Sequence, residues 1–139
     1  MRLQDHLALY NVLQEDLPVV LLYVFEPSLL IDKHYSARHW NFVKESLRDL
    51  QDQLSAYHTE ILIVEGEVVS VFKTLIEHIK IHTVFSYQET GLRITYNRDI
   101  ALEKFAISLK KEQPDKKFGW VEFCTNGVQR GLRNRKGWS

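Results

Sequence analysis

Three glutamates follow short apolar runs of the sequence, two of them immediately and the third two residues later. Glu26 and Glu65 each follow an apolar run at once, and Glu89 comes two residues after Tyr87, which ends a third run. A carboxylate can accept hydrogen bonds from the ribose hydroxyls or the ring N–H groups of a ligand. Alternatively, these glutamates cap nearby helix N-termini, where the helix dipole favours negative charge. The sequence leaves both interpretations open.

A basic segment near the end of the chain is a second candidate for binding chemistry. Four basic residues form a run without acids next to Trp138, namely Arg130, Arg133, Arg135 and Lys136. Arginines beside an aromatic ring can follow phosphates and stack on a base, as nucleic-acid binding requires. The alternative is a solvated linker end that packs on another domain. The chain has 18 basic and 18 acidic residues, so no overall positive field attracts a nucleic acid.

The sequence lacks the motifs of common enzymes and metal sites. It contains no Gly-x-Gly-x-x-Gly and no Gly-Lys-Ser/Thr, which excludes a dinucleotide fingerprint and a P-loop. His78 and His82 are spaced as metal ligands on a helix can be, but no carboxylate or cysteine completes the set. Cys124 is the only cysteine, and we interpret it as a small, semi-buried residue. We therefore predict neither a catalytic group nor a metal site.

Strands and helices alternate along the chain and would position these residues. Short apolar runs predict strands at residues 19–25, 61–64, 83–87 and 118–123. Helical spacing predicts a short helix capped by Asp5, a second capped by Ser36, a third carrying Val69 to Ile79, and a fourth from Ile94 to Glu112. This order is typical of an α/β fold with an open, mostly parallel, Rossmann-like sheet and helices on both faces. Ligands of such sheets bind beyond the carboxyl ends of the strands.

The same spacing predicts which helical residues face the core. They are Ala8, Leu9, Val12 and Leu13 in the first helix, Trp40, Val43, Leu47, Leu50 and Leu54 in the second, Val69, Phe72, Leu75, Ile76 and Ile79 in the third, and Ala101, Phe105 and Leu109 in the fourth.

Length and composition indicate one domain of an ordinary globular protein. The chain has 139 residues, of which 45% are hydrophobic. Its longest apolar run, Leu17 to Phe25, is far shorter than the ~20 residues of a membrane span, and no signal peptide is recognisable. A single cysteine cannot form an internal disulfide and favours a reducing compartment, so we expect a cytoplasmic protein.

Several ordered motifs resemble those of the DNA photolyase and cryptochrome family. Residues 2–9 are similar to the end of the motif Arg-Asp-Leu-Arg-Leu-x-Asp-Asn/His-x-Ala-Leu, and residues 24–27 to a strand end that usually carries Asp-Pro. Residues 36–47 resemble the helix Arg-x-x-Phe-Leu-x-Glu-Ser-Leu-x-x-Leu, and residues 64–66 the strand end Val-x-Gly.

Two further motifs extend the resemblance to the end of the chain. Glu89 with Arg98 and Asp99 is similar to the acidic residue after a strand and the downstream Arg-Asp of the family. Residues 120–138 resemble a segment of cryptochrome-like members, Trp-x-Glu-Phe-x-Gln-x-Gly-Val-x-Arg-x-Leu-x-x-Arg-x-x-Trp.

This resemblance implies an N-terminal α/β domain over residues 1–124, with 125–139 as a linker toward a helical domain that is absent here. In the family, that helical domain binds FAD and damaged DNA, and the α/β domain of many members holds an antenna pigment, which is a folate, a deazaflavin or a flavin. The parent is then a deoxyribodipyrimidine photolyase, a carbon–carbon lyase of DNA repair, or a cryptochrome-like photoreceptor. The fragment alone is expected to be inactive, and Glu26, Tyr87 and Glu89 are the expected pigment-pocket residues.

The sequence departs from the family's pattern at one place, and two alternative functions remain open. The family has a strand ahead of its Arg-Asp-Leu-Arg motif, and only Arg2 of that motif's arginines is present, so we expect the first strand to be missing. In the family's strand order that strand is central. Its loss would expose sheet edges that pair with another chain, which predicts self-association. The alternative functions are a free-standing nucleotide or small-ligand binding module and a purely structural α/β domain.

Overall fold

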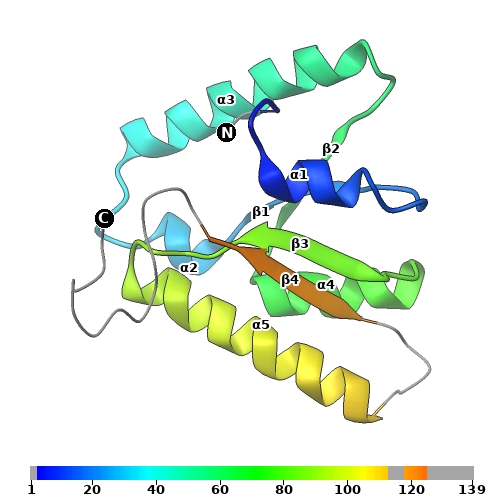
Figure 1. Ribbon diagram of the computed structural model, residues 1–139. Coiled ribbons are helices and arrows are strands. Elements are labelled where there is room, and N and C mark those ends of the chain that lie inside the picture. Colours follow the sequence, from blue (N-terminus) through cyan, green and yellow to red (C-terminus); the bar gives the residue numbers. More distant parts are fainter. Residues whose placement is uncertain (1–2, 113–117, 125–139) are drawn as a thin grey trace, which may run out of the picture. The chain divides into compact units, whose positions relative to one another are not determined.

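The computed structural model describes residues 3–112 and 118–124 of the chain, which has an α/β fold of helices and short parallel strands. It divides into two compact units, Met1–Ile81 and His82–Ser139, each of which is considered by itself (Figure 1). The first unit runs α1–β1–α2–α3–β2–α4, and the second runs β3–α5–β4. No helix in the described part of the chain is long and apolar enough to cross a membrane.

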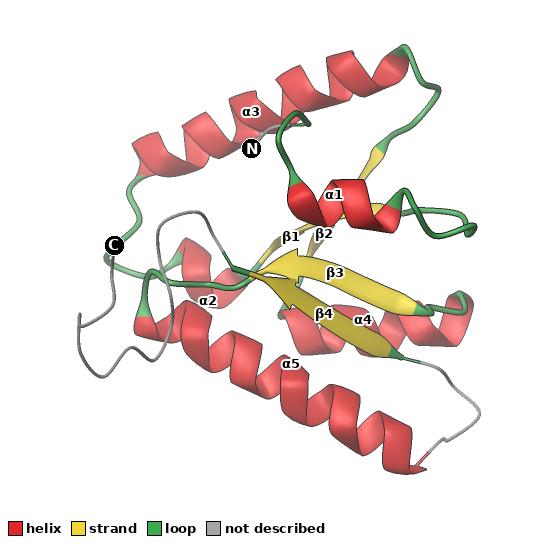
Figure 2. Ribbon diagram, in the orientation of Figure 1, coloured by secondary structure: helices red, strands yellow, loops and turns green. Residues whose placement is uncertain are grey.

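The sheet of unit 1 consists of two parallel strands (Figure 2). Strand β1 (Leu21–Phe25) pairs with β2 (Ile61–Glu65), with Leu21 opposite Ile61 and Phe25 opposite Glu65. Both predicted strands are confirmed, although β1 begins two residues later than the run starting at Val19. None of the β1 residues is fully buried, and Leu62 and Ile63 of β2 are 40% and 49% exposed.

Helix α3 (Ala37–Ser55) connects β1 to β2 and carries the largest group of core residues in unit 1. The Ser36 hydroxyl accepts the backbone N–H of His39 at 3.3 Å, so the predicted cap is confirmed. Four of the five predicted core residues are buried, namely Val43, Leu47, Leu50 and Leu54, whereas Trp40 is half-buried.

The short helices of unit 1 correct several sequence predictions. Helix α1 (Leu7–Val12) is capped by His6, whose Nδ1 accepts the N–H of Leu9 at 3.0 Å. Asp5 is therefore not the cap, because it lies one residue too early and has a φ of 51°. Helix α2 (Pro27–Leu30) was not predicted at all, since four residues are too few to show a helical period.

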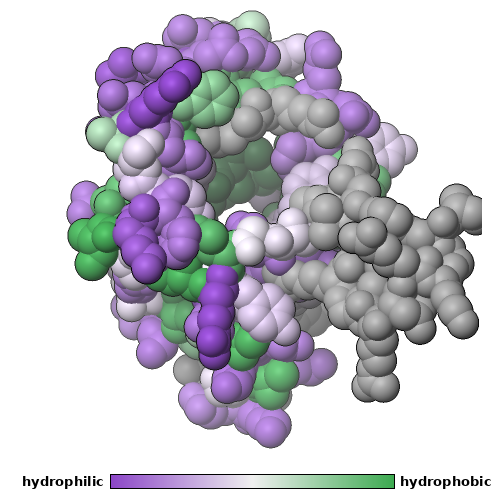
Figure 3. Space-filling view, turned by 90° about the vertical axis from the view of Figure 1, so that its left-hand side faces the viewer, coloured by the Kyte–Doolittle hydropathy of each residue, from purple (hydrophilic) through white to green (hydrophobic). Residues whose placement is uncertain are grey.

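Core assignments near helix ends are the least accurate. Leu13 ends α1 and is 62% exposed, contrary to prediction. Helix α4 (Val68–His78) buries Val71 and Phe72, while Ile79 lies just beyond it in extended conformation and is 42% exposed. Apolar side chains thus reach the surface, and green apolar atoms lie among purple hydrophilic ones on the face drawn in Figure 3.

Unit 2 is one strand–helix–strand element. Strand β3 (Thr83–Tyr87) pairs in parallel with β4 (Gly119–Phe123), and α5 (Arg93–Glu112) connects them and packs beside β4 (Figure 1). The predicted bounds of β3 are confirmed. Helix α5 buries Leu102 and Leu109, whereas Ala101, predicted to face inward, is exposed. Phe105 is half-buried and makes an edge contact with the ring of Phe118 at 5.8 Å.

Truncating the α3 core should destabilise the fold. We expect Leu47→Ala to lower the free energy of unfolding by about 2–5 kcal/mol, because Leu47 is 4% exposed and its loss leaves a cavity. Phe42→Ala on the same helix is the matched control, with an expected change within about 0.5 kcal/mol at a side chain that is 65% exposed. Urea denaturation measures both, and equal effects would contradict the assignment of the buried face.

An exposed contact between Asp32 and His34 in the loop before α3 gives a pH-dependent prediction. Asp32 Oδ1 accepts the backbone N–H of His34 at 2.9 Å and lies 2.7 Å from its Nδ1. The backbone N–H first, and then the ring, lower the pKa of Asp32. Its contribution to stability is therefore present above the pKa of an unfolded aspartate and is lost as the pH falls through the lowered folded value.

An NMR titration of the Asp32 carboxyl should give a midpoint below that of an ordinary aspartate. His34→Ala should raise the midpoint only in part, since the backbone hydrogen bond remains. A wild-type midpoint at the ordinary value would show that the loop contact does not persist in solution.

Candidate functional site

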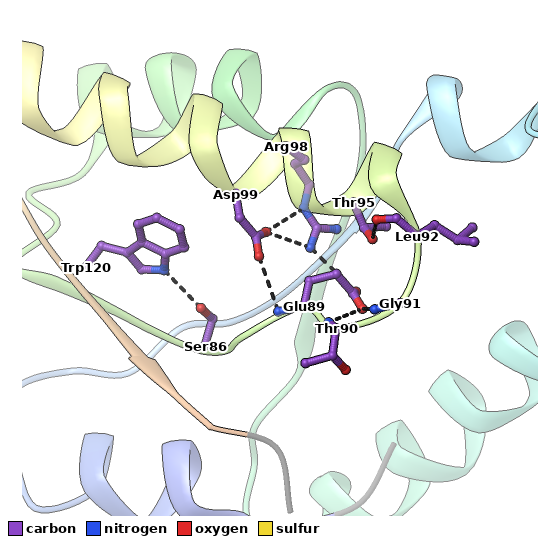
Figure 4. Close-up of polar contacts among 9 residues, drawn as sticks. All are labelled: Ser86, Glu89, Thr90, Gly91, Leu92, Thr95, Arg98, Asp99 and Trp120. Carbon is purple, nitrogen blue, oxygen red and sulfur yellow. Dashed lines mark hydrogen bonds and ion pairs between the residues drawn. The ribbon is translucent and has the colours of Figure 1, made fainter. Parts of the chain in front are cut away.

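The carboxyl end of β3 and the first turns of α5 form the candidate site of unit 2 (Figure 4). Parallel sheets of α/β proteins bind ligands at this edge. Two of the residues predicted from the sequence lie here, Tyr87 as the last residue of β3 and Glu89 in the loop that follows. Both lie at this edge because they are only two residues apart in the sequence.

The Glu89 carboxylate organises the loop that leads into α5. Its Oε1 accepts the backbone N–H groups of Thr90 and Gly91, both at 2.9 Å. A side chain at position 91 would be tight, because a Cβ there would lie 3.1 Å from Glu89 Oε1. Thr90 and Gly91 precede Arg93, the first residue of α5, so these bonds order the turn ahead of the helix and are not helix-capping bonds.

Asp99 and Arg98 fasten this loop to α5 (Figure 4). Asp99 Oδ2 accepts the backbone N–H of Glu89 at 3.2 Å, and its Oδ1 accepts Arg98 Nε at 3.2 Å and Nη2 at 3.0 Å. Arg98 Nη2 also lies 3.9 Å from Glu89 Oε2, an ion-pair distance. The family-like pair of Arg98 and Asp99 thus acts on Glu89 through its backbone and its carboxylate. Asp99 itself is only 6% exposed.

The polar side chains of this loop are suited to binding a ligand. Its two carboxylates and one guanidinium carry a net negative charge, which favours ligands with N–H, hydroxyl or cationic groups. The side chain of Glu89 is 33% exposed, so a ligand has access to it from solvent. Thr95, which is 2% exposed, uses its hydroxyl to bond the carbonyl of Leu92 at 2.7 Å and so supports the first turn of the helix.

Two aromatic rings lie on the same face of the strand pair as Tyr87. Phe85 stacks on Phe123 with ring centroids 6.3 Å apart, and Tyr87 meets the edge of Phe123 at 6.5 Å. Trp120 belongs to β4 as well, and its indole N–H donates to the Ser86 hydroxyl at 2.9 Å. Trp120 and Ser86 lie on the opposite face of the pair. Tyr87 is half-buried beside Phe123 and can offer a ligand both a ring and a phenol group.

Glu26, the third predicted site residue, lies in unit 1, where it joins β1 to α2. It is 3% exposed, and its backbone carbonyl accepts the N–H groups of Leu29 at 2.9 Å and Leu30 at 3.0 Å. Its side chain makes no capping bond to α2. Glu26 is therefore a buried carboxylate at the carboxyl end of its strand, whereas Glu65 at the end of β2 is exposed.

Sequence reasoning missed Glu67, which holds the carboxyl-end loops of unit 1 together. Glu67 Oε1 accepts the backbone N–H of Ser28, and Oε2 accepts the Ser28 hydroxyl, both at 2.9 Å. Gly66, with a φ of 153°, donates its N–H to the carbonyl of Phe25 at 3.0 Å. The available signal was a second acid directly behind the Glu65-Gly66 turn.

An aromatic cluster in unit 1 was also missed as a cluster. The rings of Tyr35, His39 and Trp40 lie 4.7 to 5.2 Å apart, and Phe25 of β1 lies 6.1 Å from Trp40. The indole N–H of Trp40 is buried and has no acceptor among the residues that the structure describes. A buried donor without an acceptor is costly, so this cluster is suited to a planar ligand that offers one.

The remaining candidates contribute no further site. The basic residues Arg130, Arg133, Arg135 and Lys136 lie outside the described residues. Cys124 is exposed, so its interpretation as a semi-buried residue was wrong, and its Sγ lies 3.6 Å from Gln88 Oε1. Within residues 3–112 and 118–124, no group of three or more His, Cys, Asp or Glu side chains is placed to hold a metal ion.

The loop bonds of Glu89 predict a structural cost when its carboxylate is removed. We expect Glu89→Ala to lower the free energy of unfolding by about 1 kcal/mol, because the N–H groups of Thr90 and Gly91 lose their hydrogen-bond acceptor. Glu103→Ala, at an exposed position of α5, is the control and should change it by less than about 0.5 kcal/mol. Equal stability of both variants in denaturant melts would show that the bonds of Glu89 to the loop do not stabilise the fold.

Comparisons with known proteins identify the family of the chain. The DNA photolyase family matches residues 1–113. A curated relative, cryptochrome-1 of Spalax judaei, is 26% identical over 106 residues, which make up 76% of this chain and 18% of that cryptochrome. No solved structure gives a significant match. Since the family match covers α1 to α5, the chain belongs to the DNA photolyase family.

Proposed function

We propose that this chain is the antenna-pigment scaffold of a light-dependent DNA photolyase or a cryptochrome-like photoreceptor. The observation that carries the proposal is the family match over residues 1–113, the part of the chain that contains α1 to α5. The site chemistry supports a binding role, because carboxylates and aromatic rings meet at the carboxyl end of β3. A folate, a deazaflavin and a flavin are all planar and carry polar ring groups, which fits such a set.

The pigment-binding residues of this proposal in unit 2 are Tyr87 and Glu89. Glu26, in unit 1, is a separate candidate acceptor at the end of its own strand. Tyr87 supplies a ring face beside Phe123. Glu89 supplies an acceptor that is already oriented by Thr90 and Gly91. A preoriented acceptor loses little conformational freedom when a ligand binds, which favours affinity.

The whole protein's chemistry belongs to the same proposal. FAD and damaged DNA are bound by a following helical domain, and this chain alone neither repairs DNA nor signals. The pigment absorbs light and transfers the excitation energy to that flavin. The basic residues from Arg130 to Lys136 belong to the linker before the helical domain, and contact with DNA is the alternative role for them. The lone cysteine favours a cytoplasmic location.

Pigment binding to the 139-residue chain tests the proposal. We expect FMN or methenyltetrahydrofolate to bind with quenching or enhancement of its fluorescence, and Glu89→Gln to weaken binding about 5-fold, the equivalent of one lost hydrogen bond of about 1 kcal/mol. Tyr87→Ala should weaken binding at least as much. Tyr57→Ala, at a ring that is 74% exposed in unit 1, is the control and should leave affinity unchanged.

The same titration separates the proposal from its alternative. Binding of AMP with equal dependence on Glu89, and of neither pigment, would favour a free-standing nucleotide-binding module. Failure of every ligand would contradict a pigment pocket in this chain.

A further inference from the structure

The Arg98 guanidinium lies near two carboxylates of unit 2 and is hydrogen bonded to one of them (Figure 4). Its Nε and Nη2 donate to Asp99 Oδ1 at 3.2 and 3.0 Å, whereas Nη2 lies 3.9 Å from Glu89 Oε2. The first two distances are those of hydrogen bonds, and the third is too long for one. Arg98 is therefore held by Asp99, although Glu89 lies close to the same nitrogen.

Burial explains why Asp99 holds the guanidinium more closely than Glu89 does. The side chain of Asp99 is 8% exposed, and that of Glu89 is 33% exposed. Water screens the charge of Asp99 less, so its attraction for a cation is stronger. Arg98 and Asp99 are consecutive residues of α5, and consecutive side chains of a helix do not normally face each other. The long Arg98 side chain must therefore bend toward its neighbour to make this contact.

The two oxygens of the Glu89 carboxylate have different surroundings. Oε1 accepts the backbone N–H groups of Thr90 and Gly91, and Oε2 is the oxygen that lies near Arg98. A movement of Arg98 Nη2 by about 1 Å would bring it to the roughly 2.9 Å of a charge-assisted hydrogen bond with Oε2. A guanidinium in that position would compete with the N–H groups of a ligand for the same carboxylate.

We propose that Asp99 sets the affinity of the Glu89 site for ligands with N–H groups, because it holds Arg98 away from Glu89 Oε2. This inference rests on the function proposed above, in which Glu89 is an acceptor for the pigment ring. Asp99 is a positioning residue, which acts on the ligand through Arg98 and through the backbone N–H of Glu89, bonded to Oδ2 at 3.2 Å. When Asp99 loses its charge, Arg98 moves to Glu89 and weakens ligand binding.

The charges of the three side chains predict a specific order of affinities. Glu89 and Asp99 are negative and Arg98 is positive, so together they carry one negative charge. Asp99→Asn makes the net charge zero and leaves Glu89 as the one carboxylate of the three that attracts Arg98. Adding Arg98→Gln restores one negative charge, which then lies on Glu89 alone. A ligand that donates N–H groups should therefore bind the wild type and the double variant more tightly than it binds Asp99→Asn.

Titration of the 139-residue chain with methenyltetrahydrofolate tests this order. We expect Asp99→Asn to weaken binding about 5-fold, as the loss of one hydrogen-bond acceptor does. Adding Arg98→Gln should recover the lost affinity. The asparagine amide has the shape of the aspartate and keeps an oxygen for the N–H of Glu89, so the loop bond to α5 is retained.

The recovery separates a positioning role of Asp99 from a merely structural one. If Asp99 only supported the loop, a second substitution at its neighbour Arg98 would not restore binding. Arg93→Gln in the Asp99→Asn background is the matched control, because it removes the same charge from an exposed residue of α5 and should recover nothing. Unchanged affinity of Asp99→Asn, no recovery with Arg98→Gln, or equal recovery with Arg93→Gln would overturn the proposal.

A double-mutant cycle tests the position of Arg98 without any pigment. Denaturant melts of Arg98→Gln, Glu89→Gln and the pair give the coupling between the two side chains. We expect little coupling in the wild type, where Nη2 and Oε2 are 3.9 Å apart. In the Asp99→Asn background the coupling should favour folding by about threefold more in the equilibrium constant, because Arg98 then bonds Glu89.

The pigment-free cycle also distinguishes this inference from the proposed function. Equal coupling in both backgrounds would overturn the hold of Asp99 on Arg98, whether or not a pigment binds. Stronger coupling in the Asp99→Asn background, together with a wild type that binds no pigment, would support that hold and contradict the pigment function alone.

Discussion

Helices that follow parallel strands all begin at the same edge of the sheet, so their unbonded N–H groups gather there. In this protein the Ser36 hydroxyl caps α3, and carboxylates hold backbone N–H groups at the start of α2 and ahead of α5. In unit 1, Glu67 holds both the N–H and the hydroxyl of Ser28 at the start of α2. In unit 2, Glu89 holds the N–H groups of Thr90 and Gly91 ahead of α5, and Asp99 in turn holds the N–H of Glu89. These bonds hold the loops that follow β1 and β3.

The regular elements were predictable because their signals are local. The uninterrupted apolar runs gave the strands, and Ser36 followed by apolar residues at helical spacing gave α3. Helix α2 and the cap of α1 were not predictable in this way. The four residues of α2 are too few to show a helical period. His6 caps α1 through a ring nitrogen, although a carboxylate such as that of the neighbouring Asp5 is the more usual capping group.

The candidate site was predictable only in part, and the reason is again distance along the chain. Tyr87 and Glu89 are two residues apart and lie at one strand end in the structure. The bond from Ser28 to Glu67 spans 39 residues, and no local pattern announces it. The cluster of Tyr35, His39 and Trp40 joins a loop to the start of a helix, and β1 adds Phe25, so the cluster exists only once the strand and helix are placed. Periodicity alone made Trp40 a core residue, whereas it is half-buried with a buried indole N–H.

The hydrogen bond from Trp120 to Ser86 gives unit 2 an optical reporter of its own. It joins β4 to β3 at 2.9 Å and breaks when that strand pair separates. Trp40 on α3 is the corresponding indole of unit 1, and its ring lies beside those of Tyr35 and His39. A chain with two compact units is not bound to unfold in a single step. With Trp138 replaced by phenylalanine, the emission of each remaining indole would follow the unit that contains it, and the cooperativity between the two units becomes a measurable quantity.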